Sequence, residues 1–410
     1  MKNRFLYQCS LVLTISILLG QVPRVFAQFS EKRLDNLLKR FPEADANGDG
    51  ELSVAEALAY REQARRELDS NSGNNRQRGG PREVPIDAGW DEEKFPEHAV
   101  CYMSPEEIRE LYASLKKPGQ PTVVSFEKPK DGALRIVGTG HSFMAPGYRT
   151  LPLICEAAGF EQPLYTHTSG GMTGSARYKW EQENGIFQFD GKPMPKLLAS
   201  ISNAEWDAMM WGPYFMDRPE FYTCWIDFCK KYNPEMKFFL SDAWPQLYQL
   251  GKDPESEDVF TEELMERLGA EKNEAYGELL EKLREENPGK VFMLPTSDAM
   301  VLAAKHFLRG ELPGIEGMHK AVGGKDRSLW RDRLGHLGPG FDRLEGYVFY
   351  ATLYGRSPEL IEKKIRFEDK GSFPSPELDR IFRKITWQAV INHPLSGVTD
   401  EDGDGIGDLK

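Results

Sequence analysis

The stretch that decides the fold is Leu134-Arg-Ile-Val-Gly-Thr-Gly-His-Ser-Phe-Met-Ala-Pro-Gly-Tyr-Arg-Thr-Leu-Pro-Leu-Ile154. Residues 134–137 are a short apolar run that ends at Gly138 and Gly140, which favours a buried strand closing in a sharp turn. Apolar residues then recur at helical spacing, at Leu151, Ile154, Ala157 and Ala158. The stretch therefore predicts a strand, a glycine turn and a helix.

Ser142 lies in this predicted turn. In open α/β folds, ligands bind at the carboxyl ends of the strands, and the start of the next helix favours negative charge there. A serine in this position is therefore a candidate nucleophile. The alternative is that Ser142 only caps the helix, which is a common role of serine.

The chain downstream alternates between short apolar runs and helical patterns. The predicted strands are 134–137, 163–166, 208–211, 237–240 and 290–294, and the predicted helices are 148–158, 219–232, 262–286, 297–308 and 339–354. Residues 314–333 are rich in glycine and charge and indicate a long loop. Such alternation predicts an α/β protein with a three-layer α/β/α, flavodoxin-like, mostly parallel sheet.

The N-terminus predicts an export signal. Lys2 and Arg4 precede an apolar run over residues 5–20, and residues 25–27 offer a cleavage site, whereas the run is short for a membrane span. Residues 1–27 contain three basic and no acidic residues, so their removal takes the formal net charge from −12 to −15. We expect a secreted or periplasmic protein without a membrane span, whose acidity disfavours nucleic acid as a partner.

Residues 30–66 predict a small helix–loop–helix that resembles an EF-hand. Oxygen-bearing residues occupy loop positions 1, 3, 5, 7, 9 and 12, with glycine at position 6: Asp45, Asn47, Asp49, Glu51, Ser53 and Glu56. Calcium takes six to eight oxygen ligands, and the sharp turn of such a loop requires glycine. We therefore expect Ca²⁺ as the cofactor; the alternative is an acidic, solvated loop.

Three further segments complete the domain plan. Residues 67–82 are polar and glycine-rich and predict a flexible linker, followed by a main domain over residues 83–396. Residues 397–410 repeat the calcium pattern, with aspartate at loop positions 1, 3, 5 and 9 (Asp400, Asp402, Asp404 and Asp408). This tail resembles a dockerin or thrombospondin type-3 calcium loop; the alternative is a disordered acidic tail.

Three motifs together point to chemistry. Gly140-His-Ser142 follows the first strand, Ser169-Gly-Gly171 begins a glycine loop after the second, and Asp332-Arg-Leu-Gly-His336 precedes the helix predicted over residues 339–354. A serine hydroxyl becomes a good nucleophile when a base takes its proton, and the base works best when an acid orients it. Serine, acid and base are all present in this set.

In this layout the chain resembles the SGNH/GDSL hydrolase superfamily over about residues 134–354. In that family the nucleophilic serine follows the first strand, a glycine follows the second, and a late Asp-x-x-His supplies acid and base. The resemblance implies that Ser142 is the nucleophile, His336 the base and Asp332 the orienting acid. It also implies an oxyanion hole formed by the backbone N–H groups of Ser142 and Gly171.

The chain departs from the family pattern in two places. Three residues instead of two separate Asp332 from His336. The Gly-x-Asn-Asp block has no counterpart, so its donor is missing or replaced, by the N–H of Gly212 or the hydroxyl of Tyr214. Losing one such donor costs about 10² to 10³-fold in rate.

The resulting hypothesis is a secreted calcium-binding serine hydrolase that cleaves acyl esters of a small molecule or a glycan, with acetylated carbohydrate as one substrate class. His141, beside the nucleophile, is expected to contact substrate or to face solvent. Aromatic residues near the strand ends are expected to be core or to line a sugar-binding cleft: Trp206, Trp211, Tyr214, Trp225, Trp244 and Trp330. The rival hypothesis is a non-catalytic calcium-binding surface or matrix protein on a degenerate hydrolase fold.

Overall fold

The computed structural model describes residues 38–39, 42–46, 48–52, 56, 123–168, 197–212, 219–367 and 373–408. The chain divides into two units, Met1–Arg78 and Gly79–Lys410. The predicted signal peptide (1–27) and linker (67–82) lie outside the described residues, as do Asn47, Ser53, Gly171 and Tyr214. Within the described ranges, no helix is both long enough and apolar enough to cross a membrane.

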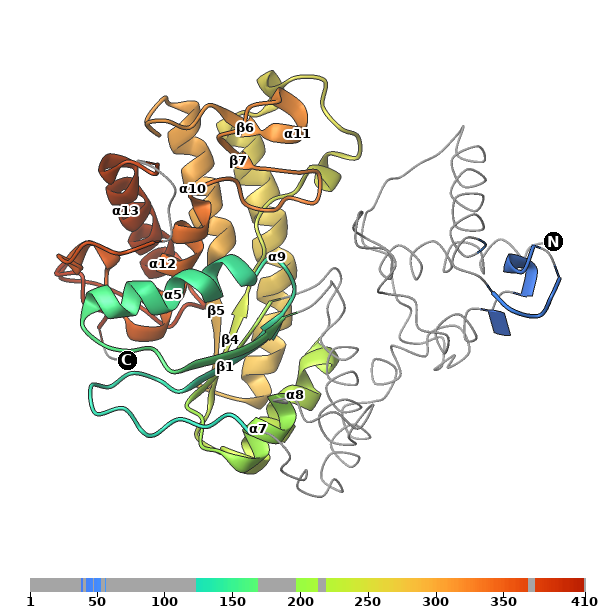
Figure 1. Cartoon of the computed structure of the whole chain (residues 1–410). Helices are drawn as coiled ribbons and strands as arrows, with labels where there is room; N and C mark the ends of the chain where they lie inside the picture. The colour runs from blue at the N-terminus through green and yellow to red at the C-terminus, as the bar shows by residue number, and fades with distance from the viewer. Residues whose placement is uncertain are drawn as a thin grey trace. The chain divides into compact units, whose positions relative to one another are not determined.

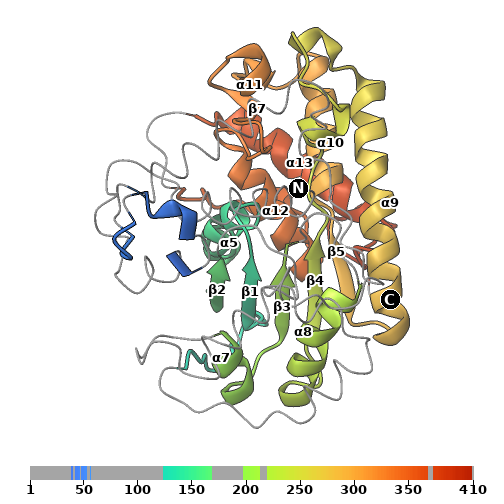
Figure 2. The same ribbon diagram turned by 90° about the vertical axis from the view of Figure 1, so that its right-hand side faces the viewer.

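A five-stranded parallel sheet forms the centre of the second unit. Its strands are β1 (Ile136–Gly140), β2 (Leu164–Thr168), β3 (Ala208–Trp211), β4 (Lys237–Ser241) and β5 (Val291–Leu294). The order is β2-β1-β3-β4-β5, as Figure 2 shows from left to right. In β1, Ile136 pairs with Leu164 on one side and with Ala208 on the other. This is the flavodoxin-like order, in which the carboxyl ends of all strands meet at one edge.

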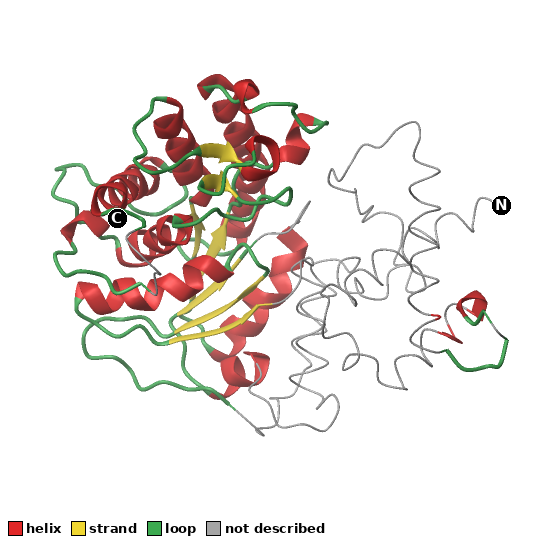
Figure 3. Ribbon diagram, turned by 45° about the horizontal axis from the view of Figure 1, so that its top comes forward, coloured by secondary structure: helices red, strands yellow, loops and turns green. Residues whose placement is uncertain are grey.

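Helices cover both faces of this sheet, so the predicted three-layer α/β/α architecture is confirmed (Figures 1 and 3). One apolar core contains Ile136 of β1 and lies under α5 (Ala145–Ala158), α10 (Thr296–Leu308), α12 (Phe341–Tyr354) and α13 (Pro376–Asn392). The other contains Val137 and lies under α7 (Leu197–Asn203), α8 (Pro219–Tyr232) and the second half of α9 (Glu262–Glu286). Successive strand residues face opposite layers because side chains alternate along a strand.

The interpretation of residues 314–333 as a long loop was wrong. They contain a second, two-stranded parallel sheet, β6 (Gly317–His319) with β7 (Ser328–Trp330), and the short helix α11 (Lys320–Gly323), at the top of Figure 1. Strands of three residues are too short for alternation to be recognised in a sequence. Short 3₁₀ turns lie at Pro42–Ala44, Leu247–Leu250, Glu257–Val259 and Pro358–Leu360.

Helix α13 was also absent from the prediction, although the sequence carries its signals. Ser375 accepts a hydrogen bond from the backbone N–H of Leu378, and Pro376 occupies the first turn. Both are ordinary helix starts. The buried residues then recur at helical spacing, at Leu378, Phe382, Ile385 and Ala389.

The acidic tail is folded against the domain. The backbone N–H of Ser357 donates to the carbonyl of Gly405 over 2.8 Å, and Gly407 donates to Gly355 over 2.7 Å. The indole N–H of Trp387, on α13, donates to Asp400 Oδ2 over 2.8 Å. Residues 399–408 are therefore bonded to the C-terminal end of α12 and to α13.

Candidate active site

The turn after β1 requires glycine at its first position. Gly140 has φ +131°, and a Cβ there would lie 3.1 Å from the backbone nitrogen of Gly212 and 3.0 Å from Cγ of Met144. The backbone N–H of Met144 donates to the carbonyl of His141, which closes the turn over Ser142. Ser142 is left exposed at the carboxyl edge of the sheet.

Ser142, His336 and Asp332 come together at this edge. Ser142 Oγ lies 2.7 Å from His336 Nε2, although the two residues are 194 positions apart in the chain. His336 Nδ1 lies 2.8 Å from Asp332 Oδ2 and 3.0 Å from Oδ1. The side chain of His336 is 16% exposed and that of Asp332 41%. With the Nδ1 proton directed at the carboxylate, Nε2 is the acceptor for the serine hydroxyl, which is the arrangement a general base needs.

The additional residue between Asp332 and His336 is absorbed in a turn. The backbone N–H of Gly335 donates to the carbonyl of Asp332 over 2.9 Å, and Gly335 has φ +88°. Asp332 Oδ1 also accepts from the backbone N–H groups of Leu334 (3.1 Å) and His336 (3.2 Å). The carboxylate is therefore fixed by its own loop and still reaches the imidazole, so the four-residue spacing leaves the geometry intact.

Ser142 does not cap the helix that follows it. Helix α5 has Met144 at its N-cap position, without a side-chain hydrogen bond. Instead, Glu345 of α12 reaches across and accepts the backbone N–H of Gly147, in the first turn of α5, over 2.7 Å. Burial raises the pKa of Glu345 well above its usual range, although the Gly147 N–H opposes this. Because Glu345 accepts this N–H group at the start of α5, the Ser142 hydroxyl is available for His336.

Aromatic side chains pack directly around the Ser142–His336 pair. The ring of Phe143 stacks on Trp244 with centroids 4.8 Å apart and meets His336 edge-on at 5.2 Å. His141 is only 7% exposed, and its Nδ1 accepts the backbone N–H of Phe143. Of the two alternatives for His141, contact with substrate or exposure to solvent, exposure to solvent is therefore wrong.

The five tryptophans expected near the strand ends belong to the core. Trp206, Trp211, Trp225, Trp244 and Trp330 are each at most 3% exposed. None of these five offers a ring face to a sugar, since stacking requires an accessible face. Any sugar-binding surface would have to use other residues.

Of the expected oxyanion donors, Gly212 and Ser142 can be placed. Gly212 directly follows β3, and a Cβ on it would lie 2.5 Å from Cγ of Met144, so it packs closely against the turn that carries Ser142. Gly171 and Tyr214 are outside the described residues. The N–H groups of Ser142 and Gly212 are therefore the candidates for binding an oxyanion that the described structure offers.

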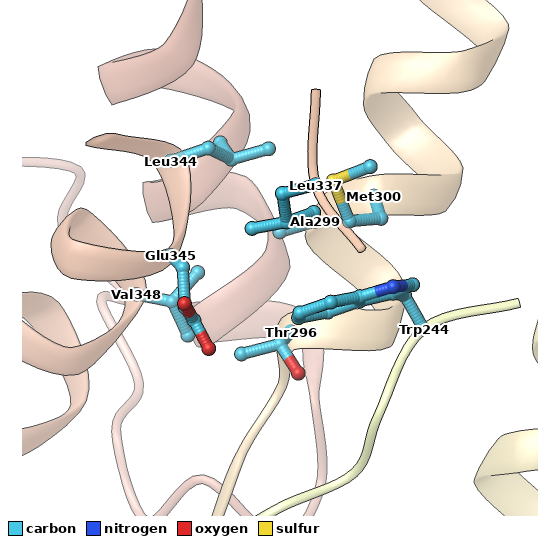
Figure 4. A pocket seen from close by; sticks show the side chains of 8 residues that line it. All are labelled: Trp244, Thr296, Ala299, Met300, Leu337, Leu344, Glu345 and Val348. Carbon is cyan, nitrogen blue, oxygen red and sulfur yellow. The ribbon is translucent and has the colours of Figure 1, made fainter. Parts of the chain in front are cut away.

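A small cavity lies behind the site, between α10, α12 and the segment after β4 (Figure 4). It is lined by Trp244, Thr296, Ala299, Met300, Leu337, Leu344, Glu345 and Val348. Oε1 of Glu345 is buried there without a hydrogen-bond partner. None of Ser142, His336 and Asp332 lines this cavity, so we do not regard it as the substrate site.

Two acidic loops offer oxygen ligands. In the first unit, Asp45 accepts the backbone N–H groups of Gly48 (2.7 Å) and Gly50 (2.9 Å), and Asp49 accepts that of Glu51. Glu56 is in a helical conformation. In the second unit, carboxylate oxygens of three aspartates lie within 4.8 Å of one another, at Asp400, Asp402 and Asp404.

Comparisons with known proteins leave the family open. No family model and no curated protein matches the chain. One similar solved structure is a DUF4886 family protein from Bacteroides uniformis, with 12% sequence identity and a TM-score of 0.42. The match covers 63% of this chain and 95% of that one.

Proposed function

We propose that this protein is a serine hydrolase that cleaves acyl esters, of the kind its sequence resemblance to SGNH hydrolases implies. The observation that carries the proposal is the contact of Ser142 Oγ with His336 Nε2 at 2.7 Å, together with the contact of His336 Nδ1 with Asp332 at 2.8 Å. Three residues of the right chemistry, from two distant parts of the chain, are thus arranged in the order that proton transfer requires.

In this mechanism His336 takes the proton of Ser142 as its oxygen attacks the ester carbonyl carbon. The protonated imidazole is stabilised by Asp332 and then gives its proton to the departing alcohol. Water then attacks the resulting acyl-serine with His336 again as base, and His336 returns that proton to Ser142 Oγ as the acid is released. Backbone N–H groups at the nucleophile turn, from Ser142 and Gly212, would stabilise the negative oxygen of each tetrahedral intermediate.

The substrate proposal is limited to the acyl ester. The acetylated-carbohydrate hypothesis drew on a cleft lined by aromatic rings, and the five tryptophans that can be placed are buried. A small activated ester is therefore the appropriate first probe, because it tests the nucleophile and base without assuming an alcohol.

The test is hydrolysis of p-nitrophenyl acetate by the wild-type protein, Ser142→Ala and His336→Ala. Each substitution should lower kcat by about 10³-fold or more. Ser256→Ala and His306→Ala, which change the same residue types elsewhere, should retain wild-type rates. Wild-type protein without activity, or unchanged rates in the two triad variants, would refute the proposal and favour the non-catalytic calcium-binding hypothesis.

We also propose that the loop of residues 45–56 binds Ca²⁺. The Asp45 carboxylate accepts two backbone N–H groups within its own loop, and Gly48 and Gly50 adopt φ values of +72° and +83° there. These bonds support the tight turn that the ligand spacing requires. Asp45, Asp49, Glu51 and Glu56 would hold the ion, with Asn47 and Ser53 as the remaining ligands expected from the sequence.

A further inference from the structure

The segment that follows β4 is held by a buried side chain, and its backbone then changes direction. The carboxyl group of Asp242 is fully buried, and its Oδ1 accepts hydrogen bonds from Thr296 Oγ1 and the backbone N–H of Ser297, both over 2.8 Å. The next residue, Ala243, has φ +36°, which is rare for a residue with a Cβ. Such strain persists only where the surroundings impose it, and it often marks a functional constraint. Here the redirected chain places Trp244.

Two side chains of this segment hold the loop that carries His336. The indole N–H of Trp244 donates to the carbonyl of Gly335 over 2.5 Å. The side-chain amide of Gln246 donates to the carbonyl of Leu334 over 2.8 Å. Trp244 is 1% exposed and Gln246 7%, so water has little access to either hydrogen bond. Lys272 Nζ lies 3.4 Å from Gln246 Oε1, which directs the NH₂ end of the amide toward the loop.

Trp244 contacts both sides of the Ser142–His336 pair. Its ring face stacks on Phe143, the residue after Ser142, at 4.8 Å. Its N–H holds the carbonyl of Gly335, the residue before His336. One rigid side chain thus spans the gap between the nucleophile turn and the base-bearing loop, which belong to segments far apart in the chain.

Resting on the proposed function, we propose that Trp244 is a positioning residue that sets the separation of Ser142 and His336, with Gln246 as its support. The loop's own hydrogen bonds hold the Asp332 carboxylate but leave the carbonyls of Leu334 and Gly335, just before His336, free to move. Fixing two consecutive carbonyls, at Leu334 and Gly335, removes that freedom. The described hydrogen bonds of these two side chains go to the loop backbone and not to Ser142 Oγ or His336 Nε2.

The test compares Trp244→Phe and Gln246→Met with wild type. Trp244→Phe removes the N–H donor and keeps an aromatic ring for Phe143, and Gln246→Met removes the amide at similar length. Each should lower kcat for p-nitrophenyl acetate roughly ten-fold, with KM little changed, because each variant loses one hydrogen bond that positions the loop of His336. The matched control is Trp206→Phe, which should retain the wild-type kcat. The indole of Trp206 is also buried, and it donates to the carbonyl of Ser200 over 3.0 Å.

A second readout does not depend on turnover. The Nδ1–H proton of His336, held by Asp332, should give a low-field proton NMR resonance, assigned by its loss in His336→Ala. That resonance should shift or broaden in Trp244→Phe and stay unchanged in Trp206→Phe. If Trp244→Phe only lowers the melting temperature, as Trp206→Phe does, and leaves this resonance as in wild type, the inference is overturned. If wild type hydrolyses no ester, the proposed hydrolase function fails, and the resonance still decides whether Trp244 positions His336.

Discussion

At the scale of single residues, Asp242 shows how the fold changes the chemistry of a side chain. Its carboxyl group is fully buried at the end of β4. Burial, together with the nearby negative charge of Asp298, raises its pKa to about 8, while the donors Ser297 and Thr296 oppose the shift. Oδ2 has no hydrogen-bond partner. The neutral acid is therefore the form that the folded protein favours.

This raised pKa makes stability depend on pH. An unfolded aspartate titrates near pH 4, so the unfolding free energy should fall as the pH rises from about 4 to about 8. Asp242→Asn, which cannot ionise, should lose less stability over that range, by on the order of a few kcal/mol. Urea unfolding at pH 5 and pH 8 measures this. The exposed substitution Asp258→Asn should behave as wild type; an equal pH dependence in Asp242→Asn and wild type would contradict the assignment.

At the scale of elements, the turn that carries Ser142 depends on the packing of α5 against α12. Glu345 holds the first turn of α5 through Gly147, and Thr150 Oγ1 donates to the carbonyl of Asp342 over 2.9 Å. A Cβ on Gly346 would lie 2.1 Å from Thr150 Oγ1, so the close approach of the two helices requires glycine. The two helices flank the site in sequence, α5 after Ser142 and α12 after His336, and their contact supports both.

Calcium binding by the loop of residues 45–56 can be tested by changing that loop alone. Replacing the first and last proposed ligands together, Asp45→Ala with Glu56→Ala, should abolish Ca²⁺ binding, because each would supply carboxylate oxygens that neutral side chains cannot replace. Isothermal titration with CaCl₂ measures this. Glu43→Ala, an exposed acid just outside the loop, should bind as wild type does. Binding that survives in the double variant would show that the ion is held elsewhere, for example at Asp400, Asp402 and Asp404.

At the scale of the whole molecule, the acidic tail forms part of the domain surface rather than an extension of it. Residues 399–408 bond to Gly355, Ser357 and Trp387, which lie just after α12 and on α13. These helices pack over the same apolar core as α5. The tail therefore stabilises α12 and α13, which lie on the same face of the sheet as α5.

Removing residues 399–410 should lower the stability of the domain. At least three hydrogen bonds between the tail and the helices would be lost, and Trp387, now 7% exposed, would be uncovered. At about 1 kcal/mol per hydrogen bond, the unfolding free energy should fall by roughly 2–4 kcal/mol. Thermal unfolding followed by circular dichroism measures this. Removal of residues 409–410 alone is the control, and equal melting temperatures for the two truncations would contradict the prediction.

The sequence alone was sufficient for the features that depend on local pattern. Residues 134–154 predicted a strand, a turn and a helix, and β1 and α5 are there. The alternation of apolar runs predicted the parallel sheet, with β3 matching its expected range. The chemistry of serine, aspartate and histidine, together with the resemblance to SGNH hydrolases, singled out Ser142, Asp332 and His336 before any distance was known. Side-chain periodicity is a local property, so it can be read without knowing what an element packs against.

Only the tertiary structure decided how those pieces meet. Trp244 and Gly335 are 91 residues apart and Glu345 and Gly147 are 198 apart, and no pattern in the chain links them. The same is true of the role of Ser142. Whether its hydroxyl caps α5 or bonds to His336 depends on Glu345, in another helix, which accepts the Gly147 N–H in the first turn of α5. These contacts form because a parallel sheet brings the carboxyl ends of separate strands to one edge, which places distant loops within hydrogen-bonding distance.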